Sequence, residues 1–539
     1  MFSHDAVPRT LPIKTITADP ATNIAIHTIE QGKQALIFVN TRRSAEALAE
    51  RIARATATSN TALHHLSETI LSALSTPTKQ CKRLAACVKK GVAFHHAGLA
   101  AKQRETIETA FREGKLAIVC ATPTLAAGID MPAYRAIIRD LKRFSGGWGM
   151  TPISVLEYHQ MAGRAGRPGM EESGEAITIA ATPSQKEDII ETFLKGEPEE
   201  ITSKLAAEPA LRVATLSLIA TEYCTTTQAL FDFFSKTFYA HQYGDMRKIH
   251  SIITRMLKHL DAWGFIITPQ GHNDFVSAKD IHAGKLRATP LGRRVAELYL
   301  DPYTAHFIIT GLRRATQKRQ SSFAYLHLLA STLEMRPLLR VKTRELDEIQ
   351  EKTAPHLDEL YVLEPSMYEE EYEDFLASLK TALFLNDWCN EVTEDVLLDR
   401  YDIRPGEIHA KLERADWLCY AAEELCRLLV FKKEKAALAK LRLRLKHGAK
   451  EELFPLLKFK HIGRVRARKL FQNGVRDVTG VKKADYTALA QLLGPGVAKD
   501  LKKQVGQTVD TKAIGPRKRK GQTGLKTYQN KKKTEKKSK

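Results

Sequence analysis

The sequence predicts a multidomain protein in which a parallel α/β domain comes first and mostly helical domains follow. Short β-type runs at residues 35–40, 92–95 and 116–121 each lead into helical or loop sequence, and two more follow near 136–139 and 175–180. Strands that alternate with helices are typical of a parallel sheet with helices on both faces. A chain of 539 residues has room for about three to five domains, each with its own core.

Residues 201–305 change from this alternation to a helical pattern. Helices are predicted at residues 210–220, 228–239 and 247–263, before two short runs that flank a polar loop and a further helix from Leu291. Three helices followed by a two-stranded wing are typical of a winged helix.

The remaining sequence predicts an almost wholly helical region and then a small domain with a basic tail. Residues 306–440 carry helical patterns, and residues 441–506 hold two glycine turns between short helices. Residues 1–20, with three prolines, are predicted to be a leader or linker, and residues 507–539 to be a disordered basic tail.

The charge of the chain favours a polyanionic partner. Lys and Arg total 83 against 62 Asp and Glu, a formal net charge of +21, and residues 512–539 hold twelve basic residues and one acid. About half of the excess is therefore in the tail. The seven cysteines form no C-x-x-C pair, and there is no signal peptide or long apolar run. We expect a soluble, cytoplasmic protein with no metal site and no membrane partner.

Three strings of chemically suggestive residues follow the predicted strands. They are Asn-Thr-Arg-Arg-Ser at 40–44, Ala-Thr-Pro-Thr-Leu-Ala-Ala-Gly-Ile-Asp-Met-Pro at 121–132, and Gln-Met-Ala-Gly-Arg-Ala-Gly-Arg-Pro-Gly at 160–169. Ligands of parallel sheets bind at the carboxyl ends of the strands. Arg164 and Arg167 are three residues apart, so they share one helical face and can converge on one triphosphate.

On these strings the chain resembles the second RecA-like domain of superfamily-two helicases, in the Ski-two-like branch that contains the archaeal HelQ-like DNA repair helicases. The matching strings are FVNTRRSAE (38–46), FHHAGL (94–99), ATPTLAAGIDMPA (121–133) and QMAGRAGRPGM (160–170). The resemblance covers about residues 25–506. It implies a RecA-like domain at 21–200, a winged helix at 201–305, a helical ratchet domain at 306–440 and a helix-hairpin-helix domain at 441–506.

The resemblance implies a nucleotide-binding edge. Arg164 and Arg167 would be arginine fingers that neutralise charge on the transferred phosphoryl group. Gln160 would help to sense the nucleotide, and Gly128 and Asp130 would lie beside it at the domain cleft.

The resemblance also implies a surface for the tracking strand. Thr41, Arg42, His96, Gly98 and Thr122 would contact its phosphates through donors that ignore base sequence. The segment 139–153 corresponds to the strand-separating hairpin, and its alternative interpretation is an ordinary surface loop.

Two further DNA contacts are implied in the helical regions. Trp417, with Arg414 one turn earlier, would stack on single-stranded bases, whereas the alternative makes Trp417 a core residue. In the later domain, Gly463 opens a helix whose amides, with Arg464, Arg466 and Arg468, would hold phosphates as part of a clamp. The alternative there is a structural hairpin with a solvated basic face.

The tail offers a candidate for binding a sliding clamp. Gln522, Leu525 and Tyr528 have the spacing of clamp-binding peptides, although Gln529 stands where a second aromatic residue is expected. The alternative is a nonspecific tether to polyanions.

The sequence contains no phosphate-cradling P-loop. Gly-Lys pairs occur at 32–33, 114–115 and 284–285 but lack the required context, so the ligands of ATP phosphates and Mg²⁺ are expected on a separate P-loop subunit. We therefore expect the C-terminal portion of an ATP-dependent 3′→5′ DNA helicase, which acts on single-stranded and forked DNA and depends on that domain in trans, as a split or truncated protein. The alternatives are a noncatalytic DNA-binding or loading protein and an RNA helicase relative.

Overall fold

The computed structural model describes residues 11–57, 60–74, 77–126, 131–144, 150–166, 172–269 and 285–508. The chain forms two compact units. The first comprises residues 1–387 and 392–442, and the second comprises residues 388–391 and 443–539.

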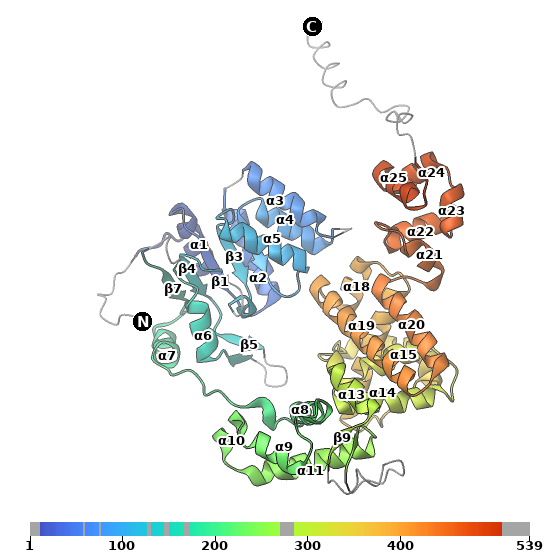
Figure 1. Ribbon diagram of the computed structural model, residues 1–539. Coiled ribbons are helices and arrows are strands. Elements are labelled where there is room, and N and C mark those ends of the chain that lie inside the picture. Colours follow the sequence, from blue (N-terminus) through green and yellow to red (C-terminus); the bar gives the residue numbers. More distant parts are fainter. Residues whose placement is uncertain are drawn as a thin grey trace. The chain divides into compact units, whose positions relative to one another are not determined.

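A five-stranded parallel sheet forms the centre of the N-terminal part (Figure 1). Its strands are β1 (Ala35–Phe38), β2 (Val92–His95), β3 (Ile118–Ala121), β4 (Arg135–Ile138) and β7 (Glu175–Thr178), in the order β2-β3-β1-β4-β7. Phe38 lies opposite Ala121 on one side and Ile138 on the other, so three strands end at the same level. The predicted parallel sheet is confirmed.

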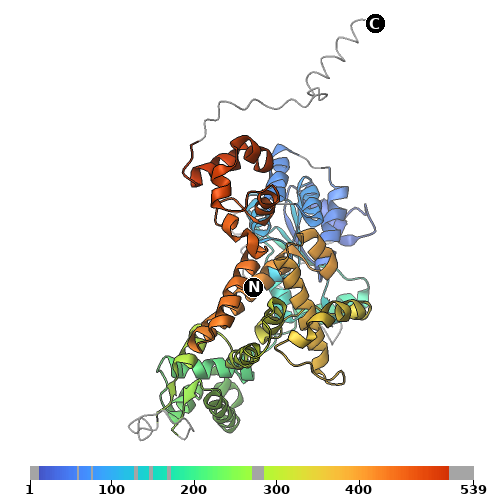
Figure 2. The same cartoon turned by 90° about the vertical axis from the view of Figure 1, so that its right-hand side faces the viewer.

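Helices surround this sheet, as both side views show in blue and teal (Figure 1, Figure 2). They are α1 (Pro20–Glu30), α2 (Arg42–Ala55), α3 (Thr61–Ser72), α4 (Lys79–Val88), α5 (Ala101–Arg112), α6 (Val155–Ala162) and α7 (Pro183–Ile189). The chain passes from β1 through α2 to β2 in one direction along the sheet, and from β2 through α5 to β3 in the opposite direction. Since connections between parallel strands are right-handed as a rule, this order places the two helices on opposite faces, and the contacts of the adjacent residues His95 with Glu108 of α5 and His96 with Glu46 of α2 agree. Leu36, Ile37 and Phe38 of the central strand are consequently 0% exposed.

Two short antiparallel strands lie where the sequence predicts a hairpin. They are β5 (Lys142–Phe144) and β6 (Met150–Pro152), with Lys142 opposite Pro152. The Gly146-Gly147 pair between these arms lies outside the described residues.

A winged-helix domain follows, with α8 (Glu208–Ala220), α9 (Thr227–Phe234), α10 (Phe238–Tyr243), α11 (Met246–Ala262), β8 (Ile266–Ile267), β9 (Arg287–Ala288) and α13 (Pro290–Glu297). The single helix predicted over residues 228–239 is two helices in the structure. The hydroxyls of Ser235 and Thr237 donate to backbone carbonyls of the preceding turn, and Thr237 is the N-cap of α10. Such local bonds compete with a continuous helix.

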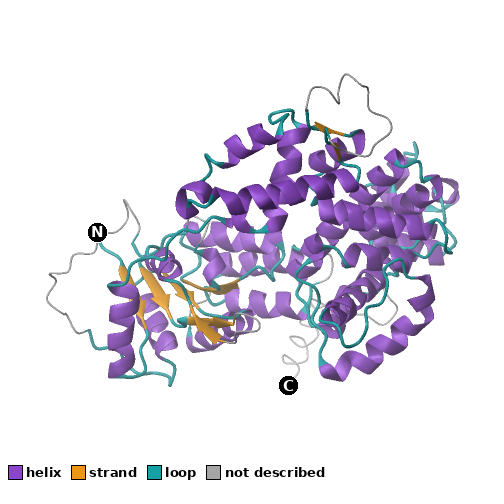
Figure 3. Ribbon diagram, turned by 90° about the horizontal axis from the view of Figure 1, so that it is seen from below, coloured by secondary structure: helices purple, strands orange, loops and turns teal. Residues whose placement is uncertain are grey.

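The next region is almost wholly helical, as predicted. Figure 3 shows how far helices outnumber strands in the molecule as a whole. Its helices are α14 (Pro302–Ala315), α15 (Ser322–Ala330), α16 (Leu346–Thr353), α17 (Glu371–Cys389), α18 (Glu394–Tyr401), α19 (Pro405–Leu428) and α20 (Lys432–His447). All seven cysteines of the chain are buried and none of them forms a disulfide, as expected of structural thiols.

The second unit contains five complete α-helices within the described residues: α21 (Phe454–Leu457), α22 (Arg464–Gln472), α23 (Val478–Lys483), α24 (Tyr486–Leu493) and α25 (Pro495–Gln504). They enclose their own core, in which Ala467, Leu470 and Leu489 are 0% exposed. Gly494, between α24 and α25, has φ +91°, a conformation that side-chain-bearing residues rarely adopt. Residues 509–539 lie outside the description.

Candidate nucleic-acid interface and nucleotide edge

A groove of about 650 Å³ lies at the carboxyl edge of the parallel sheet. It is lined by Asn40, Thr41, Arg42, Ala97, Thr122, Pro123, Thr124, Arg143, Glu157 and Gln160. These residues follow β1, β2 and β3 or belong to β5 and α6. Since β1 and β3 end at the same level, topology alone brings residues that are distant in sequence to one edge.

The first wall of the groove is the start of α2. Thr41 is the N-cap of this helix, and its hydroxyl accepts from the Ser44 amide at 3.0 Å. The backbone N–H of Asn40 donates to Asp140 Oδ2 at 3.0 Å, which fixes this residue. Arg42 Nη1 lies 2.5 Å from Glu407 Oε1, with about a third of each side chain exposed. The side-chain amide of Asn40, the hydroxyl of Thr41 and the guanidinium of Arg42 therefore share one surface, which suits a phosphate backbone.

The loop after β2 departs from one expectation. His96 is 0% exposed, and its Nδ1 accepts from the Gly98 amide at 3.1 Å. The side chain is turned inward because Glu46 Oε1 lies 3.3 Å from its Nε2. The imidazole therefore supports the Gly98 loop from inside, and a contact between this loop and a strand stays a prediction. Gly98 is also buried, and its carbonyl accepts from the Gly406 amide at 3.0 Å.

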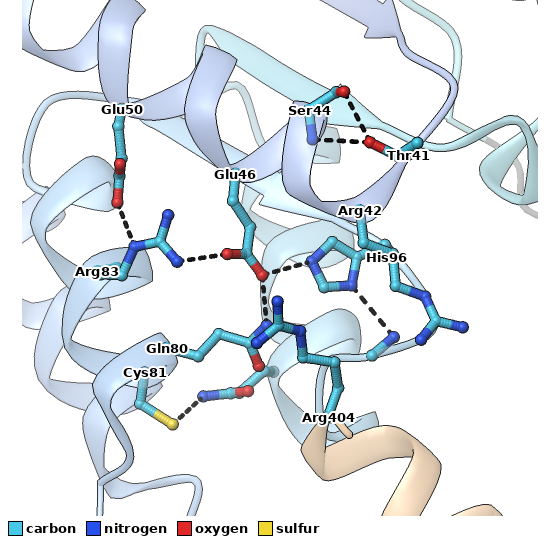
Figure 4. Close-up of polar contacts among 12 residues, drawn as sticks. Thr41, Arg42, Ser44, Glu46, Glu50, Gln80, Cys81, Arg83, His96 and Arg404 are labelled. Carbon is cyan, nitrogen blue, oxygen red and sulfur yellow. Dashed lines mark hydrogen bonds and ion pairs between the residues drawn. The ribbon is translucent and has the colours of Figure 1, made fainter. Parts of the chain in front are cut away.

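Glu46 is the centre of a buried polar network (Figure 4). Gln80 Nε2 donates to its Oε1 at 2.6 Å, and Arg83 Nη1 lies 2.5 Å from its Oε2. Burial alone would raise the pKa of Glu46. The hydrogen bonds from His96 and Gln80, with the charges of Arg83 and Arg404, outweigh burial and lower this pKa to about 2. Glu46 is therefore a carboxylate at neutral pH.

The candidate nucleotide residues lie on and just after α6. Gln160 is exposed and faces the same groove as Thr41 and Thr122. Arg164 donates from Nη2 to the carbonyl of Ala126, and its own carbonyl accepts from the Ala133 amide at 2.9 Å. Arg164 is thus anchored beside the segment after β3. Gly128, Asp130 and Arg167 lie outside the described residues.

The two-stranded hairpin borders the groove through one side chain. Arg143 of β5 reaches Glu157 of α6, with Nη1 2.5 Å from Oε1. Glu157 also accepts from the Ser154 amide, which makes it part of the capping box that begins α6. The hairpin and the helix that carries Gln160 are therefore joined at the rim of the groove.

The two candidate DNA contacts on α19 are already engaged within the chain. Trp417 is half-buried, and its indole Nε1 donates to the Leu298 carbonyl at 3.1 Å. Arg414 donates to the Arg336 carbonyl. One turn earlier, Lys411 donates to the Pro337 carbonyl at 2.7 Å, and burial, together with the charge of Arg414, lowers its pKa to about 8. These bonds tie α19 to segments that precede it in the chain.

The basic residues of α22 divide into two groups. Arg468 forms ion pairs with Glu391 at 2.6 Å and with Glu452 at 2.7 Å, so its guanidinium is engaged within the chain and its expected contact with DNA stays a prediction. Arg464 lies 4.1 Å from the centre of the Trp388 ring. Arg466 is exposed, although one of its nitrogens donates to the His461 carbonyl. A Cβ at Gly463 would meet nothing within 4 Å, so the start of α22 is open. Gln522, Leu525 and Tyr528 lie outside the described residues.

Sequence reasoning missed several residues around the groove. Glu46 and Arg143 carry no motif of their own, and Glu407 belongs to a helix far along the chain. One signal was present for Glu407, because a glutamate three residues after the start of a helix is typical of a capping box. Its second contact, with Arg42, depends on tertiary packing that sequence spacing does not reveal.

Comparisons with known families agree with this architecture. The model described as the helicase conserved C-terminal domain matches residues 20–169, and a helix-turn-helix domain matches residues 174–267. The model described as archaeal helicase, domain 4, matches residues 323–448. With the parallel sheet and its groove, these matches place the chain among the superfamily-two helicases.

Similar proteins define the branch. The ATP-dependent DNA helicase Hel308 of Methanocella arvoryzae is 37% identical over 502 residues, which are 91% of this chain and 65% of that protein. Hel308 of Pyrococcus abyssi is 37% identical over 92% of this chain and 66% of its own length, and that of Caldivirga maquilingensis is 34% identical over 89% and 64%. The chain belongs to the Hel308/HelQ-like branch and spans about 65% of the length of these relatives.

No helix in the described part of the chain is both long and apolar enough to cross a bilayer.

Proposed function

We propose that this chain supplies the second RecA-like domain and the DNA-binding accessory domains of an ATP-dependent 3′→5′ DNA helicase that acts on single-stranded and forked DNA in repair. The groove at the carboxyl edge of the sheet is the observation that carries the proposal. It gathers Thr41, Arg42 and Thr122, all expected to contact a strand, with Gln160 on the same surface. The direction of translocation rests on the resemblance to the family.

The groove suits a strand read through its backbone. Its donors are three threonine hydroxyls, two side-chain amides and two guanidiniums, which can bind phosphate oxygens without reading bases. The formal charge of +21 adds a long-range attraction for DNA that salt would screen. The β5–β6 pair borders the groove and would separate the two strands of a duplex.

The nucleotide edge is one half of an ATP site. Arg164 and Arg167 would donate to the γ-phosphate, and Gln160 would sense the nucleotide from the groove. The arrangement fits that role: Arg164 is held beside the segment after β3, where Gly128 and Asp130 follow in sequence. The 539 residues contain no P-loop, so we assign the ligands of the β-phosphate and of Mg²⁺ to a P-loop domain, either a separate subunit or a part of a longer chain.

The accessory regions would hold DNA away from the groove. Trp417 and Arg414 on α19 form the candidate ratchet contact, and the turns at Gly463 and Gly494 form two helix-hairpin-helix units that act as a clamp. Arg466 is the strongest candidate for phosphate contact in the clamp because it is exposed. Binding of a sliding clamp by Gln522, Leu525 and Tyr528 completes the proposal.

Reconstitution tests this function. The purified chain is mixed with a P-loop RecA-like domain of a Hel308 relative, and ATP hydrolysis is measured with and without single-stranded DNA. We expect DNA-stimulated hydrolysis only in the mixture, and its loss when the P-loop lysine of the added domain is replaced. Helicase-like hydrolysis by this chain alone would contradict the assignment of the phosphate ligands.

One observation favours a second candidate, a noncatalytic DNA-binding or loading protein. The sequence contains the motifs that we expect to contact DNA but no P-loop. DNA binding without hydrolysis in the mixture would support this candidate. Competition between DNA and RNA oligonucleotides of equal length tests an RNA-directed relative, which would prefer RNA.

A further inference from the structure

The start of α19 is docked on the loops that form the strand groove. The Gly406 amide, in the first turn of α19, donates to the Gly98 carbonyl at 3.0 Å. The approach is close: a Cβ at Gly406 would lie 2.1 Å from the Ala97 carbonyl oxygen and 2.8 Å from that of Leu99. Only glycine fits at position 406, so the first turn of α19 and the loop of residues 97–99 meet backbone to backbone. This contact is called the joint below.

A second tie runs between Arg42 and Glu407. Glu407 uses Oε2 to accept from the Arg404 amide at 2.8 Å, which caps its own helix, and Oε1 lies 2.5 Å from Arg42 Nη1. A guanidinium has five N–H donors, so this pairing leaves others for a ligand. Arg42 also lines the groove, which means that Glu407 holds a candidate phosphate-binding residue in place.

The buried network behind the loop fixes its shape. Because the Gly98 amide donates to Nδ1 of His96, that nitrogen carries no proton, and the Nε2 proton faces Glu46 Oε1, 3.3 Å away (Figure 4). Glu46 is itself held by Gln80 and Arg83. The order of contacts is Glu46, His96, Gly98 and then Gly406, from α2 to α19.

We propose that Glu46 and His96 are positioning residues that set the Gly98 loop for docking of α19, and that this joint links strand binding in the groove to the helix that carries Trp417. The inference deepens the proposed function and, for its DNA-binding part, rests on it. An occupied groove and a docked α19 stabilise each other, and the linkage works equally in both directions.

Amide hydrogen exchange of the full chain without DNA tests the joint. The Glu46→Gln substitution weakens the carboxylate–imidazole contact, and exchange should rise about tenfold or more both in residues 97–99 and at Gly406. The matched control is Glu108→Gln, because Glu108 Oε1 lies 2.8 Å from Nε2 of the neighbouring His95. This control should leave Gly406 protected. Equal exchange at Gly406 in the two variants would overturn the proposal.

A steric variant gives an independent route should Glu46→Gln disturb folding. Gly406→Ala inserts a methyl group at the joint. The control is Gly496→Ala, because Gly496 is also the second residue of its helix, α25, and also follows a proline. A Cβ at Gly496 would meet nothing within 4 Å. Exchange in residues 97–99 should rise in Gly406→Ala only. Unchanged exchange there would refute the joint.

The link to DNA is measured by fluorescence anisotropy with a single-stranded oligonucleotide. Gly406→Ala and Glu46→Gln should each weaken binding about fivefold or more, with Glu108→Gln equal to the unsubstituted chain. Tighter or unchanged binding by Gly406→Ala would overturn the linkage. If the unsubstituted chain did not bind DNA, the proposed function would fail, whereas the exchange data would still decide the joint.

Discussion

The sheet edge and the helices α19 and α22 contain similar candidate DNA contacts in different states. At the sheet edge, Thr41 and Thr122 line a groove, and the Thr41 hydroxyl accepts a hydrogen bond from the nearby Ser44 amide. On the helices, Trp417 and Arg468 are already bonded within the chain. The positions of residues after parallel strands follow from topology. On a helix, by contrast, a basic or aromatic side chain bonds to whichever segment of the chain packs against it.

The largest expected effect concerns the nucleotide half of the sheet edge. Arg167→Ala and Arg164→Ala should each lower hydrolysis in the reconstituted mixture by about 10³-fold or more, because an arginine finger stabilises charge in the transition state. DNA affinity should be nearly unchanged. ATPase assays and anisotropy on the same preparations measure both quantities, and an equal loss of DNA binding would refute the assignment.

Glu46 tests whether the groove depends on a buried carboxylate. Its pKa is lowered from 4.5 to about 2, so its stabilising contribution is present above pH 4.5 and is lost as the pH falls toward 2. The shift corresponds to about 3 kcal/mol at neutral pH. The stability difference between the unsubstituted chain and Glu46→Gln should shrink by about 2 kcal/mol from pH 7 to pH 3. Native-state exchange of β1 and β2 amides provides the measurement, and a pH-independent difference would contradict it.

Substitutions of Arg468 and Arg466, both on α22, distinguish a residue that stabilises the fold from one that binds DNA. Arg468→Ala removes the ion-pair partner of Glu391 and Glu452 and should destabilise the second unit by about 1–3 kcal/mol. Arg466→Ala should leave stability nearly unchanged and reduce the salt dependence of DNA binding by about one phosphate contact. Thermal unfolding and salt titrations distinguish the two. The reverse pattern would show that Arg468 contacts DNA after all.

Trp417 should have the smallest effect. Trp417→Phe keeps an aromatic face but loses the bond to the Leu298 carbonyl, whereas Trp417→Leu loses both. If the ring stacks on a base, the leucine variant should bind single-stranded DNA about 1 kcal/mol more weakly than the phenylalanine variant. Equal affinities in anisotropy measurements would favour the core interpretation.

The parts of the molecule that sequence predicted well are those set by local pattern and chain order. Strands β1 to β4 and β7 lie within about two residues of their expected positions, and the wing and the helical region follow their patterns. The prediction of one helix over residues 228–239 was wrong, because hydroxyl bonds at Ser235 and Thr237 compete with the helix.

The candidate site was only partly predictable. Topology brought Thr41, Arg42 and Thr122 to one groove, and Gln160, which we expected at the nucleotide edge, lines the same groove. The sequence could not show that His96 would turn inward, because its burial depends on Glu46 in α2, fifty residues earlier. Nor could it show that Arg42 meets Glu407, since that contact joins segments more than 350 residues apart.

Amide exchange of the full chain with and without a single-stranded oligonucleotide tests the central claim most directly. If the groove at the sheet edge is the strand-binding surface, DNA should protect residues 40–44, 97–99 and 122–125. Protection confined to residues 443–508, with no change at the sheet edge, would contradict that claim.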